Sequence, residues 1–433
     1  MSSHRSQSAA PLDLSKWRKV PNLLIGVGGL LALIGLVVSL KLDAGREFGF
    51  AWLVAFMFSF SICIGALFLV MAHHLFDASW SLPIRRISEN IASLLPWMAL
   101  FFIPVALLAP KMYAWMSVAD PVADHALHAK APLFTKWGFY GSSALIFGVL
   151  SWVALGLRKW SVAQDQTGAA ECTHKMRGFA YVGIFFFAFL VTLGTIMWMK
   201  GLQHQWFSTM YGVCYFAGSV WLMLATVYFI TLSLSRMNVL KAVLHQHQFY
   251  YLGTLFFAFT VFYAYVNFSQ YFIIWNANMP EETFWYLQRE HGNWFLVSLV
   301  IIFGHFFLPF LLLLRIDMKE NFKVMAFFAG WAWLMHFVDM TFQILPVAHP
   351  AGFPLKWIWL SLGCTAFIVG CLAKLYLAKS AGAAPYPLKD PRLAEALGRL
   401  EPTTPISGGN VEDVDDYDDA ELKDVHTQSP GGK

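Results

Sequence analysis

The stretch NWFLVSLVIIFGHFFLPFLLLLRIDMKENFKVMAFFAGWAWLMHFVDMTFQIL, residues 293–345, consists of two apolar runs joined by the short charged link RIDMKE. Each run has the length of about 20 residues that a helix needs to cross a bilayer. The stretch therefore predicts a helical hairpin in a membrane. Because the apolar runs also contain ionisable residues, we expect this hairpin to take part in the function.

Three ionisable residues of the hairpin fall where a bilayer makes charge costly. His305 lies near the midpoint of the first run and His336 near the midpoint of the second. At the rise of an α-helix, the two imidazoles are expected within roughly 5 Å of each other in depth. Asp339 follows His336 by three residues and therefore shares its helix face. A carboxylate at this depth costs on the order of 3 kcal/mol, so it needs a polar partner.

The composition assigns the chain to the polytopic membrane proteins. Of its 433 residues, 58% are apolar and 13% are charged, whereas soluble domains are about 45–50% apolar and about 25% charged. Its five cysteines have no paired spacing, so the sequence contains no recognisable motif for an iron–sulfur cluster, zinc or c-type haem. The first apolar run, residues 21–40, is too long for a signal peptide and lacks a cleavage site, so we expect it to remain as a span.

We predict an all-α polytopic membrane protein of about ten transmembrane helices. The predicted spans are residues 21–40, 49–75, 91–112, 133–157, 178–200, 208–235, 249–275, 292–315, 323–345 and 353–379. Spans two to five and spans six to nine recur at similar offsets, and four helices are an even number. The two sets therefore run in the same direction, as two four-helix bundles in parallel repeat plus two flanking helices.

This division separates six segments of the chain. They are an N-terminal tail at 1–20, a flanking first helix at 21–48, the first bundle at 49–200, the second bundle at 201–345, a flanking tenth helix at 346–380 and a disordered tail at 381–433. The tail is predicted from its few apolar residues and from the acidic run EDVDDYDD at 412–419. The links on one side hold 22 of the 30 lysines and arginines, which places both termini in the cytoplasm.

The buried histidines and the aspartate leave three interpretations open. In the first, His305, His336 and Asp339 form a proton relay, because imidazole titrates near neutral pH and a carboxylate can hold the proton. Tyr263 and Asn267, with Gln270, could extend that path toward the outer face. In the second, an interhelical His–Asp hydrogen bond only fixes the bundle and moves no proton. In the third, the two histidines bind a b-type haem, but the chain offers no clear second pair, so we expect no haem and no metal.

A second informative stretch is MAHHLFDASWSLPIRRISEN, residues 71–90, which leaves the membrane and returns through an amphipathic segment. His74 and Asp77 are three residues apart and share a face at the predicted cytoplasmic mouth of the first bundle. They could load protons from the cytoplasm. An ordinary interfacial turn, with its polar groups reaching to water, explains the pattern equally well.

The run HHLFDASWSLPIRR at 73–86, together with ten spans in a four-plus-four repeat, resembles the F-type membrane subunits of bacterial alternative complex III. These subunits belong to the NrfD/polysulfide-reductase-C-like family, and the resemblance covers nearly all of residues 20–380. It implies two four-helix bundles with two flanking helices and no haem or cluster on this chain. The implied partners are haem c subunits, an iron–sulfur subunit, a C-type NrfD-like membrane subunit and a terminal oxidase.

We therefore expect a membrane subunit of a respiratory oxidoreductase that takes electrons from quinol to cytochrome c or another high-potential acceptor. The chain would contribute a transmembrane proton path and a quinone-facing surface in the bacterial inner membrane, with no redox centre of its own and no nucleic-acid partner. In this family the quinol pocket is better supported for the C-type subunit, so no quinone site transfers residue by residue. The alternatives are a secondary transporter with a buried His/Asp site and a purely structural anchor. Pro104 in the third span has no counterpart in the seventh, whereas transporters usually break matching helices.

Overall fold

The computed structural model describes residues 14–118, 124–131, 133–240 and 243–396. Within these residues the regular secondary structure is helical throughout, and nine helices are long and apolar enough to cross a membrane. A bent pair of helical segments, 82–101 and 103–112, brings the number to ten if the pair crosses as one span. The prediction of an all-α polytopic membrane protein of about ten helices is confirmed.

The spanning helices are α1 Lys19–Asp43, α2 Arg46–Leu75, α7 Lys136–Thr167, α8 Ala170–Trp198, α9 Tyr211–Arg236, α10 Gln246–Ala277, α12 Asn293–Val300 continued by η4 Ile301–Phe307 and α13 Leu308–Leu313, α15 Phe322–Ile344, and α16 Ile358–Ala381. Shorter segments connect them: η1 Ser15–Arg18, η2 Ala114–Ser117, α6 His125–Ala129, η3 Lys200–Gln203, α11 Pro280–Glu290, α14 Ile316–Glu320, η5 Leu345–Val347 and α17 Leu393–Ala396.

The third predicted span is bent and begins earlier than its apolar run. Its first part comprises α3 Leu82–Ala92 and α4 Leu95–Phe101, and its second part is α5 Ile103–Met112, which turns away by 49°. Pro104 lies in the first turn of α5. A proline removes one backbone donor and clashes with the carbonyl four residues before it, which accounts for the bend at this point.

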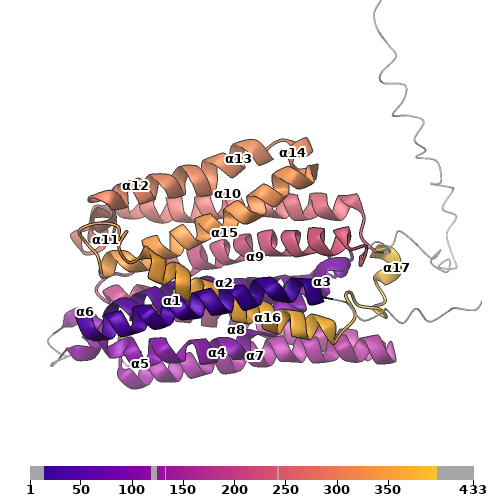
Figure 1. Cartoon of the computed structure of the whole chain (residues 1–433), viewed down its shortest axis with the longest axis horizontal. Helices are drawn as coiled ribbons and strands as arrows, with labels where there is room; N and C mark the ends of the chain where they lie inside the picture. The colour runs from indigo at the N-terminus through magenta and orange to yellow at the C-terminus, as the bar shows by residue number, and fades with distance from the viewer. Residues whose placement is uncertain (1–13, 119–123, 132, 241–242, 397–433) are drawn as a thin grey trace, which may run out of the picture.

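The long helices lie side by side along the longest axis of the molecule, with α2 in the middle (Figure 1). Most of the side chains of α2 are buried, because the helix is apolar on every face and is surrounded by other helices. It packs against α3, α5 and α8 of the first predicted bundle and also against α9 and α15 of the second. The helix contacts thus join the two predicted bundles, and the parallel repeat between them stays a prediction.

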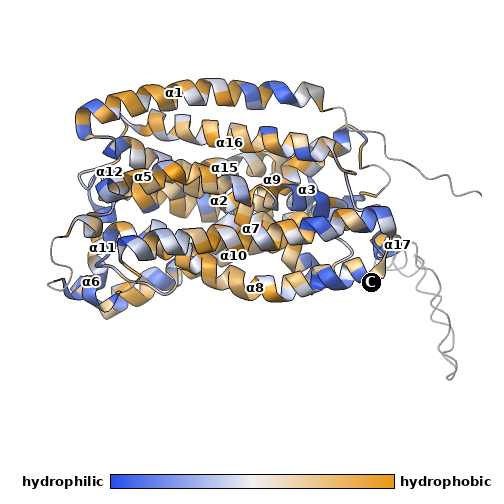
Figure 2. Ribbon diagram, turned by 90° about the horizontal axis from the view of Figure 1, so that it is seen from below, coloured by the Kyte–Doolittle hydropathy of each residue, from blue (hydrophilic) through white to orange (hydrophobic). Residues whose placement is uncertain are grey.

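The two flanking helices, α1 and α16, form a pair along one side of the molecule (Figure 2). Glycines make this pair close: a Cβ atom on Gly28 would lie 2.5 Å from the backbone nitrogen of Phe367. Close backbone approach through small residues is typical of membrane helices. The hydropathy colouring shows apolar residues along the middle of the helices and hydrophilic residues toward their ends.

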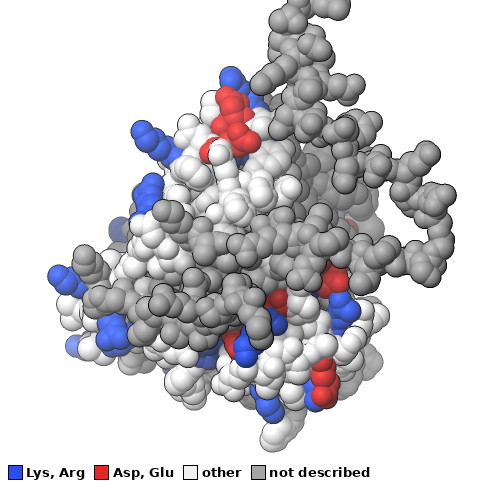
Figure 3. Space-filling view, turned by 90° about the vertical axis from the view of Figure 1, so that its right-hand side faces the viewer, with Lys and Arg blue, Asp and Glu red and all other residues white. Residues whose placement is uncertain are grey.

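Both described ends of the chain lie at one end of the molecule. Leu14 and Trp17 line the same cleft as Ala384 and Pro385, and we call this the α17 end and the opposite one the α11 end (Figure 1). Figure 3 looks onto the α17 end and shows lysines and arginines spread around its rim. Which end faces the cytoplasm stays a prediction from the distribution of positive charge.

The predicted disordered tail begins too early in the chain. Residues 382–396, which the composition assigned to that tail, form ordered structure that includes α17, and the side chain of Asp390 is fully buried. This segment packs on α3 because its charged side chains find buried partners there. The acidic run at 412–419 lies outside the described residues.

Candidate functional site

The predicted relay residues gather where α15 meets α9, α10, α2 and the π-helical segment η4. His305, His336 and Asp339 are buried, with 0%, 0% and 4% of their surface exposed. Tyr263 is buried beside them on α10. Burial of ionisable groups in the middle of membrane helices is costly, so their hydrogen-bond partners decide what the site can do.

His336 is held by a serine of the central helix. Its Nε2 atom lies 2.9 Å from the hydroxyl oxygen of Ser61, and that hydroxyl donates to the carbonyl oxygen of Met57 at 2.9 Å. Because the serine proton is already used, the Nε2–H of His336 is the donor, which assigns the neutral tautomer. Its Nδ1 atom has no hydrogen-bond partner among the described residues and is therefore free to accept a proton.

His305 lies flat between two aromatic rings. Its ring centroid is 3.8 Å from that of Trp221 on one side and 3.8 Å from that of Tyr263 on the other. Neither ring nitrogen hydrogen-bonds to another described residue. His305 belongs to the π-helical turn η4, and such turns are frequent at functional sites because they displace one residue from the regular helix face.

Tyr263 connects the histidines to the carboxylate. Its ring stacks on His305, and it lines the same small cavity as Asp339. His336 and Tyr263 both face Gly218: a Cβ atom there would lie 3.2 Å from Cε1 of His336 and 3.4 Å from Cε2 of Tyr263. The predicted residues His305, His336, Asp339 and Tyr263 are thus neighbours in space.

Asp339 has neutral partners. The side-chain amide of Gln343 donates to its Oδ1 atom at 3.2 Å, and in the described part of the chain no lysine or arginine pairs with it. Beside the carboxylate lies a cavity of about 10 Å³, lined by Tyr263, Asn267, Gln343 and Cys214 among others. That volume is close to the least that holds one water molecule. A water here would have the carboxylate and the Asn267 amide within reach.

Polar side chains continue from this cavity toward the α11 end. Asn267 donates to the carbonyl oxygen of Tyr263 in its own helix, at 2.9 Å. One turn further along α10, Gln270 accepts from Ser208 at 2.7 Å and donates to the hydroxyl of Tyr286 at 2.9 Å. The structure therefore places Tyr263, Asn267 and Gln270 in one polar row, in the order the sequence predicts.

The interhelical His–Asp hydrogen bond of the second interpretation is absent from the described residues, because neither ring nitrogen of His305 has a hydrogen-bond partner there. His336, on the same helix as Asp339, bonds to Ser61 of α2, whereas Asp339 bonds to Gln343. Residues three apart share a helix face, but neighbouring helices bring other polar groups closer than the helix itself does. The interpretation in which a His–Asp bond fixes the bundle was therefore wrong in its geometry.

The predicted proton-loading pair at the other end is also separated. His74 is buried, and neither of its ring nitrogens has a hydrogen-bond partner among the described residues. Asp77 lies beyond the end of α2 with a positive φ of 53°, and its carboxylate pairs with Arg177 at 2.5 Å and with Arg392 at 2.8 Å. The hydrogen bond from Arg177 and the charge of Arg392 lower the pKa of Asp77. Asp77 thus stays ionised near neutral pH and is unsuited to loading protons.

Next to His74 the structure buries a group of charges on the predicted amphipathic segment. Arg85 of α3 pairs with Glu89 at 2.9 Å and with Asp390 at 2.6 Å, and Arg392 pairs with Asp390 at 2.9 Å. Arg86 completes what we call the arginine cluster, by pairing with Glu89 at 2.9 Å and with Asp165 of α7. These arginines are buried because carboxylates from distant parts of the chain, Asp165 and Asp390, pair with them.

The arginine cluster also fixes the histidine beside His74. Nη1 of Arg85 lies 3.0 Å from Nε2 of His73, and the opposite ring atom, Nδ1, lies 2.6 Å from the hydroxyl of Ser81. An arginine only donates, so the Nε2 atom of His73 accepts and the Nδ1 atom carries the proton. His73 is thereby held as a neutral imidazole and is part of the packing of this end.

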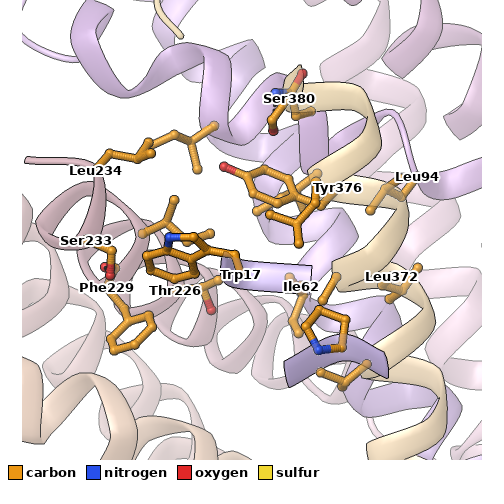
Figure 4. Close-up of a pocket in the computed structure, with 18 of the residues that line it drawn as sticks. Trp17, Ile62, Leu94, Thr226, Phe229, Ser233, Leu234, Leu372, Tyr376 and Ser380 are labelled. Atoms are coloured by element: carbon orange, nitrogen blue, oxygen red, sulfur yellow. Dashed lines mark hydrogen bonds between the residues drawn. The ribbon is translucent and has the colours of Figure 1, made fainter. Parts of the chain in front are cut away.

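An apolar cleft of about 510 Å³ opens between α1, α3, α9, α15 and α16. Figure 4 shows side chains of α9 along one wall and of α16 along the other, with the indole of Trp17 between them. Ile62 and Cys63 in its lining directly follow Ser61, the partner of His336. The lining of the cleft is therefore adjacent in sequence to Ser61 of the buried polar site.

Sequence reasoning missed Ser61, Trp221 and Gln343, which hold His336, His305 and Asp339 respectively. Only Gln343, four residues after Asp339 on the same helix, had a signal in its spacing. No protein-family model and no curated protein sequence matches this chain.

Proposed function

We propose that this chain is an integral membrane subunit of a respiratory oxidoreductase that oxidises quinol and reduces cytochrome c or another high-potential acceptor. Within it, the residues around Asp339 would carry protons. The complex itself is suggested by the resemblance of the run at 73–86 to F-type subunits of alternative complex III. The proton role is supported most directly by one observation: Asp339 is buried among membrane helices with neutral hydrogen-bond partners.

A carboxylate with neutral partners can change its protonation state without breaking an ion pair. The amide of Gln343 donates to ionised Asp339, and Tyr263 lines the cavity beside the carboxylate. On protonation, the carboxyl group becomes a donor to a water in the adjoining cavity. Waters held by Asn267 and Gln270 would then move the proton to or from the α11 end.

The proposed route covers only half of the membrane. Toward the α17 end, α2 offers the apolar sequence ICIGALFLVMA at 62–72 between the serine that holds His336 and the buried histidine pair. In that half the arginine cluster uses its carboxylates in ion pairs. The free Nδ1 atom of His336, which faces Gly218 of α9, would therefore end the route as an acceptor.

We place the quinone-facing surface at this apolar cleft, because its volume and lining suit an isoprenoid chain. A photoreactive quinone should label residues such as Phe229 and Tyr376 that line it. Labelling confined to partner subunits would remove this surface from the proposal. Electron transfer itself is assigned to partner subunits that carry c-type haem and iron–sulfur clusters, together with a C-type membrane subunit. The positive charge at the α17 end leads us to place both termini in the cytoplasm of a bacterial inner membrane.

The first test is a purification of the tagged chain in mild detergent, followed by a visible spectrum. Copurifying c-type haem subunits, with no haem absorbance from the chain alone, are expected. A chain that purifies alone and colourless would favour the transporter alternative. The two results thus distinguish a subunit of a respiratory complex from a secondary transporter.

The second test substitutes Asp339→Asn, which keeps the shape of the side chain and removes its charge. We expect assembly and electron transfer to remain and the number of protons moved per electron to fall. Asp317→Asn is the matched control, because Asp317 is exposed and pairs with Arg315 in the link between helices. An unchanged proton ratio for Asp339→Asn would remove Asp339 from the path, and loss of assembly would indicate a structural anchor.

A further inference from the structure

A second charge is buried near Asp339 without a partner of opposite sign. Arg289 of α11 is only 1% exposed, and in the described residues no carboxylate pairs with it. Its guanidinium donates to three backbone carbonyl oxygens: those of Trp285 at 2.9 Å, Phe342 at 3.1 Å and Gln343 at 3.0 Å. Its carbon Cζ lies 3.5 Å from the ring centroid of Trp285. The guanidinium is therefore fixed in position.

The carbonyl groups of Phe342 and Gln343 belong to the last turn of α15, which ends at Ile344. Carbonyls in the last turn of a helix lack partners within the helix and carry partial negative charge. They stabilise a cation at this place. Burial lowers the pKa of Arg289 to about 9, so the side chain is still a cation near neutral pH.

Gln343 joins this cation to the carboxylate. Its backbone carbonyl accepts from Arg289, and its side-chain amide donates to Asp339. Tyr211 of α9 lines the small cavity together with Asp339. Two buried charges of opposite sign, neither with a direct ion-pair partner among the described residues, are thus connected through Gln343.

We propose that Arg289 is the counter-charge of Asp339 and sets the pH at which Asp339 takes up its proton. The inference rests on the proposed function, because it concerns the regulation of the same site. Arg289 acts as a positioning residue: it touches neither the proton nor the water, but its fixed positive charge favours the ionised carboxylate.

Lys200 of η3, next to the cavity residue Met199, is a second buried cation, and its Nζ atom donates to the carbonyl oxygen of Trp206 at 3.0 Å. The other groups around the two charges are neutral near pH 7 or paired with each other. Glu47 of α2 pairs with His349 beyond α15, at 2.9 Å. The remaining groups are phenols, a thiol and the two imidazoles discussed above: Tyr211, Cys214 and Tyr215 of α9, Tyr263 of α10, Tyr286 of α11, His305 of η4 and His336 of α15. Among the described residues, Arg289 is the buried cation that hydrogen bonds join to Asp339, through Gln343.

The size of the effect follows from the separation of the charges. One helical turn and two hydrogen bonds place them roughly 10 Å apart. With an effective dielectric constant of about 20, removal of the cation raises the midpoint of Asp339 protonation by about one pH unit. A lysine at this position keeps the charge and should keep most of that shift.

The experiment titrates the full chain in lipid nanodiscs by infrared spectroscopy, following the carboxylic C=O band that Asp339→Asn removes. Arg289→Gln is expected to raise the midpoint of that band by about one pH unit, and Arg289→Lys is expected to leave it within a few tenths of the wild-type value. A role limited to capping α15 predicts that both variants lose stability and that neither moves the midpoint. That outcome would overturn the proposal.

If Arg289→Gln does not fold, the proposal is tested by whether the double variant Arg289→Gln/Asp339→Asn folds. Loss of a counter-charge is relieved when its partner is neutralised, so the double variant should fold; its failure to fold would count against the proposal. The titration uses the chain without quinol or partner subunits. A shifted midpoint together with an unchanged proton ratio in Asp339→Asn would therefore sink the proposed function and leave this inference standing.

Discussion

Asp390 and Asp77 allow a direct test of how burial determines the strength of an ion pair, because both accept a hydrogen bond from Arg392. The Asp390 carboxylate is 0% exposed and also pairs with Arg85 at 2.6 Å. The Asp77 carboxylate is 51% exposed and also pairs with Arg177 at 2.5 Å. The perturbation is the substitution of each aspartate by asparagine, which preserves shape and removes one negative charge.

The expected magnitudes differ widely. Removing one partner of a buried ion pair leaves an uncompensated charge and costs about 3–5 kcal/mol. Removing one partner of an exposed pair costs about 0.2–1 kcal/mol. The loss in Asp390→Asn cannot exceed the free energy with which residues 382–396 pack on α3, because beyond that value the segment detaches. We therefore expect local release of this segment while the helices stay folded.

Hydrogen exchange measured by mass spectrometry follows that release. In Asp390→Asn, backbone amides of residues 382–396 should exchange more than a hundredfold faster than in the wild type, since 1.4 kcal/mol corresponds to a factor of ten. In Asp77→Asn the increase should stay below tenfold. The amides of α16 act as the internal control. Equal increases in the two variants would refute the argument that burial of the carboxylate decides its contribution.

Three further outcomes are expected. The pKa of Asp390 is held below its usual value, because hydrogen bonds from Arg392 and the charge of Arg85 outweigh the effect of burial. Protection of residues 382–396 from hydrogen exchange should therefore be complete above the ordinary Asp pKa of about 3.9 and be lost only as the pH falls below it. Gly28→Val should separate α1 from α16 and lower the midpoint of thermal unfolding, because its Cβ would lie 2.5 Å from a backbone atom. Gly26→Val is the control and should change that midpoint little, because a Cβ there would have no atom within 4 Å. Equal shifts in the two variants would contradict the role of close helix packing. Burial lowers the pKa of Lys200 to about 8, so stability should rise by on the order of 3 kcal/mol between about pH 8 and about pH 10.4, where the unfolded chain binds the proton and the folded chain does not. Lys200→Gln should abolish that rise in denaturation curves.

The spans could be predicted because they depend on local properties. The length of an apolar run determines whether a helix can cross the bilayer, and this is readable without knowledge of the neighbours. The burial of Arg85 and Arg86 could not be predicted in this way. Their partners Asp165 and Asp390 are far away in the sequence, and Asp390 stands in a segment whose composition is typical of disorder. Charge pairing across the fold overrode that composition.

In the candidate site, the depth of the histidines in the membrane could be predicted from the sequence, but their contacts could not. Equal depth of His305 and His336 followed from the helix rise, and the structure brings the two imidazoles together. Their partners could not be inferred, because Ser61 comes from a helix of the other predicted bundle and because a π-helical turn changes the direction in which His305 points. Periodicity predicts the face of a helix, but the neighbouring helix determines the hydrogen bond.

The chain buries charge in two different ways, and the difference bears on function. At the α17 end, each arginine of the cluster lies against a carboxylate, so that a change of protonation would break an ion pair and expose an uncompensated charge. Asp339 and Arg289, by contrast, form no direct ion pair among the described residues and are joined by hydrogen bonds through Gln343. A carboxylate held by neutral donors loses little when it takes up a proton. The cluster is therefore suited to fixing the fold, and Asp339 is the buried carboxylate suited to exchanging protons.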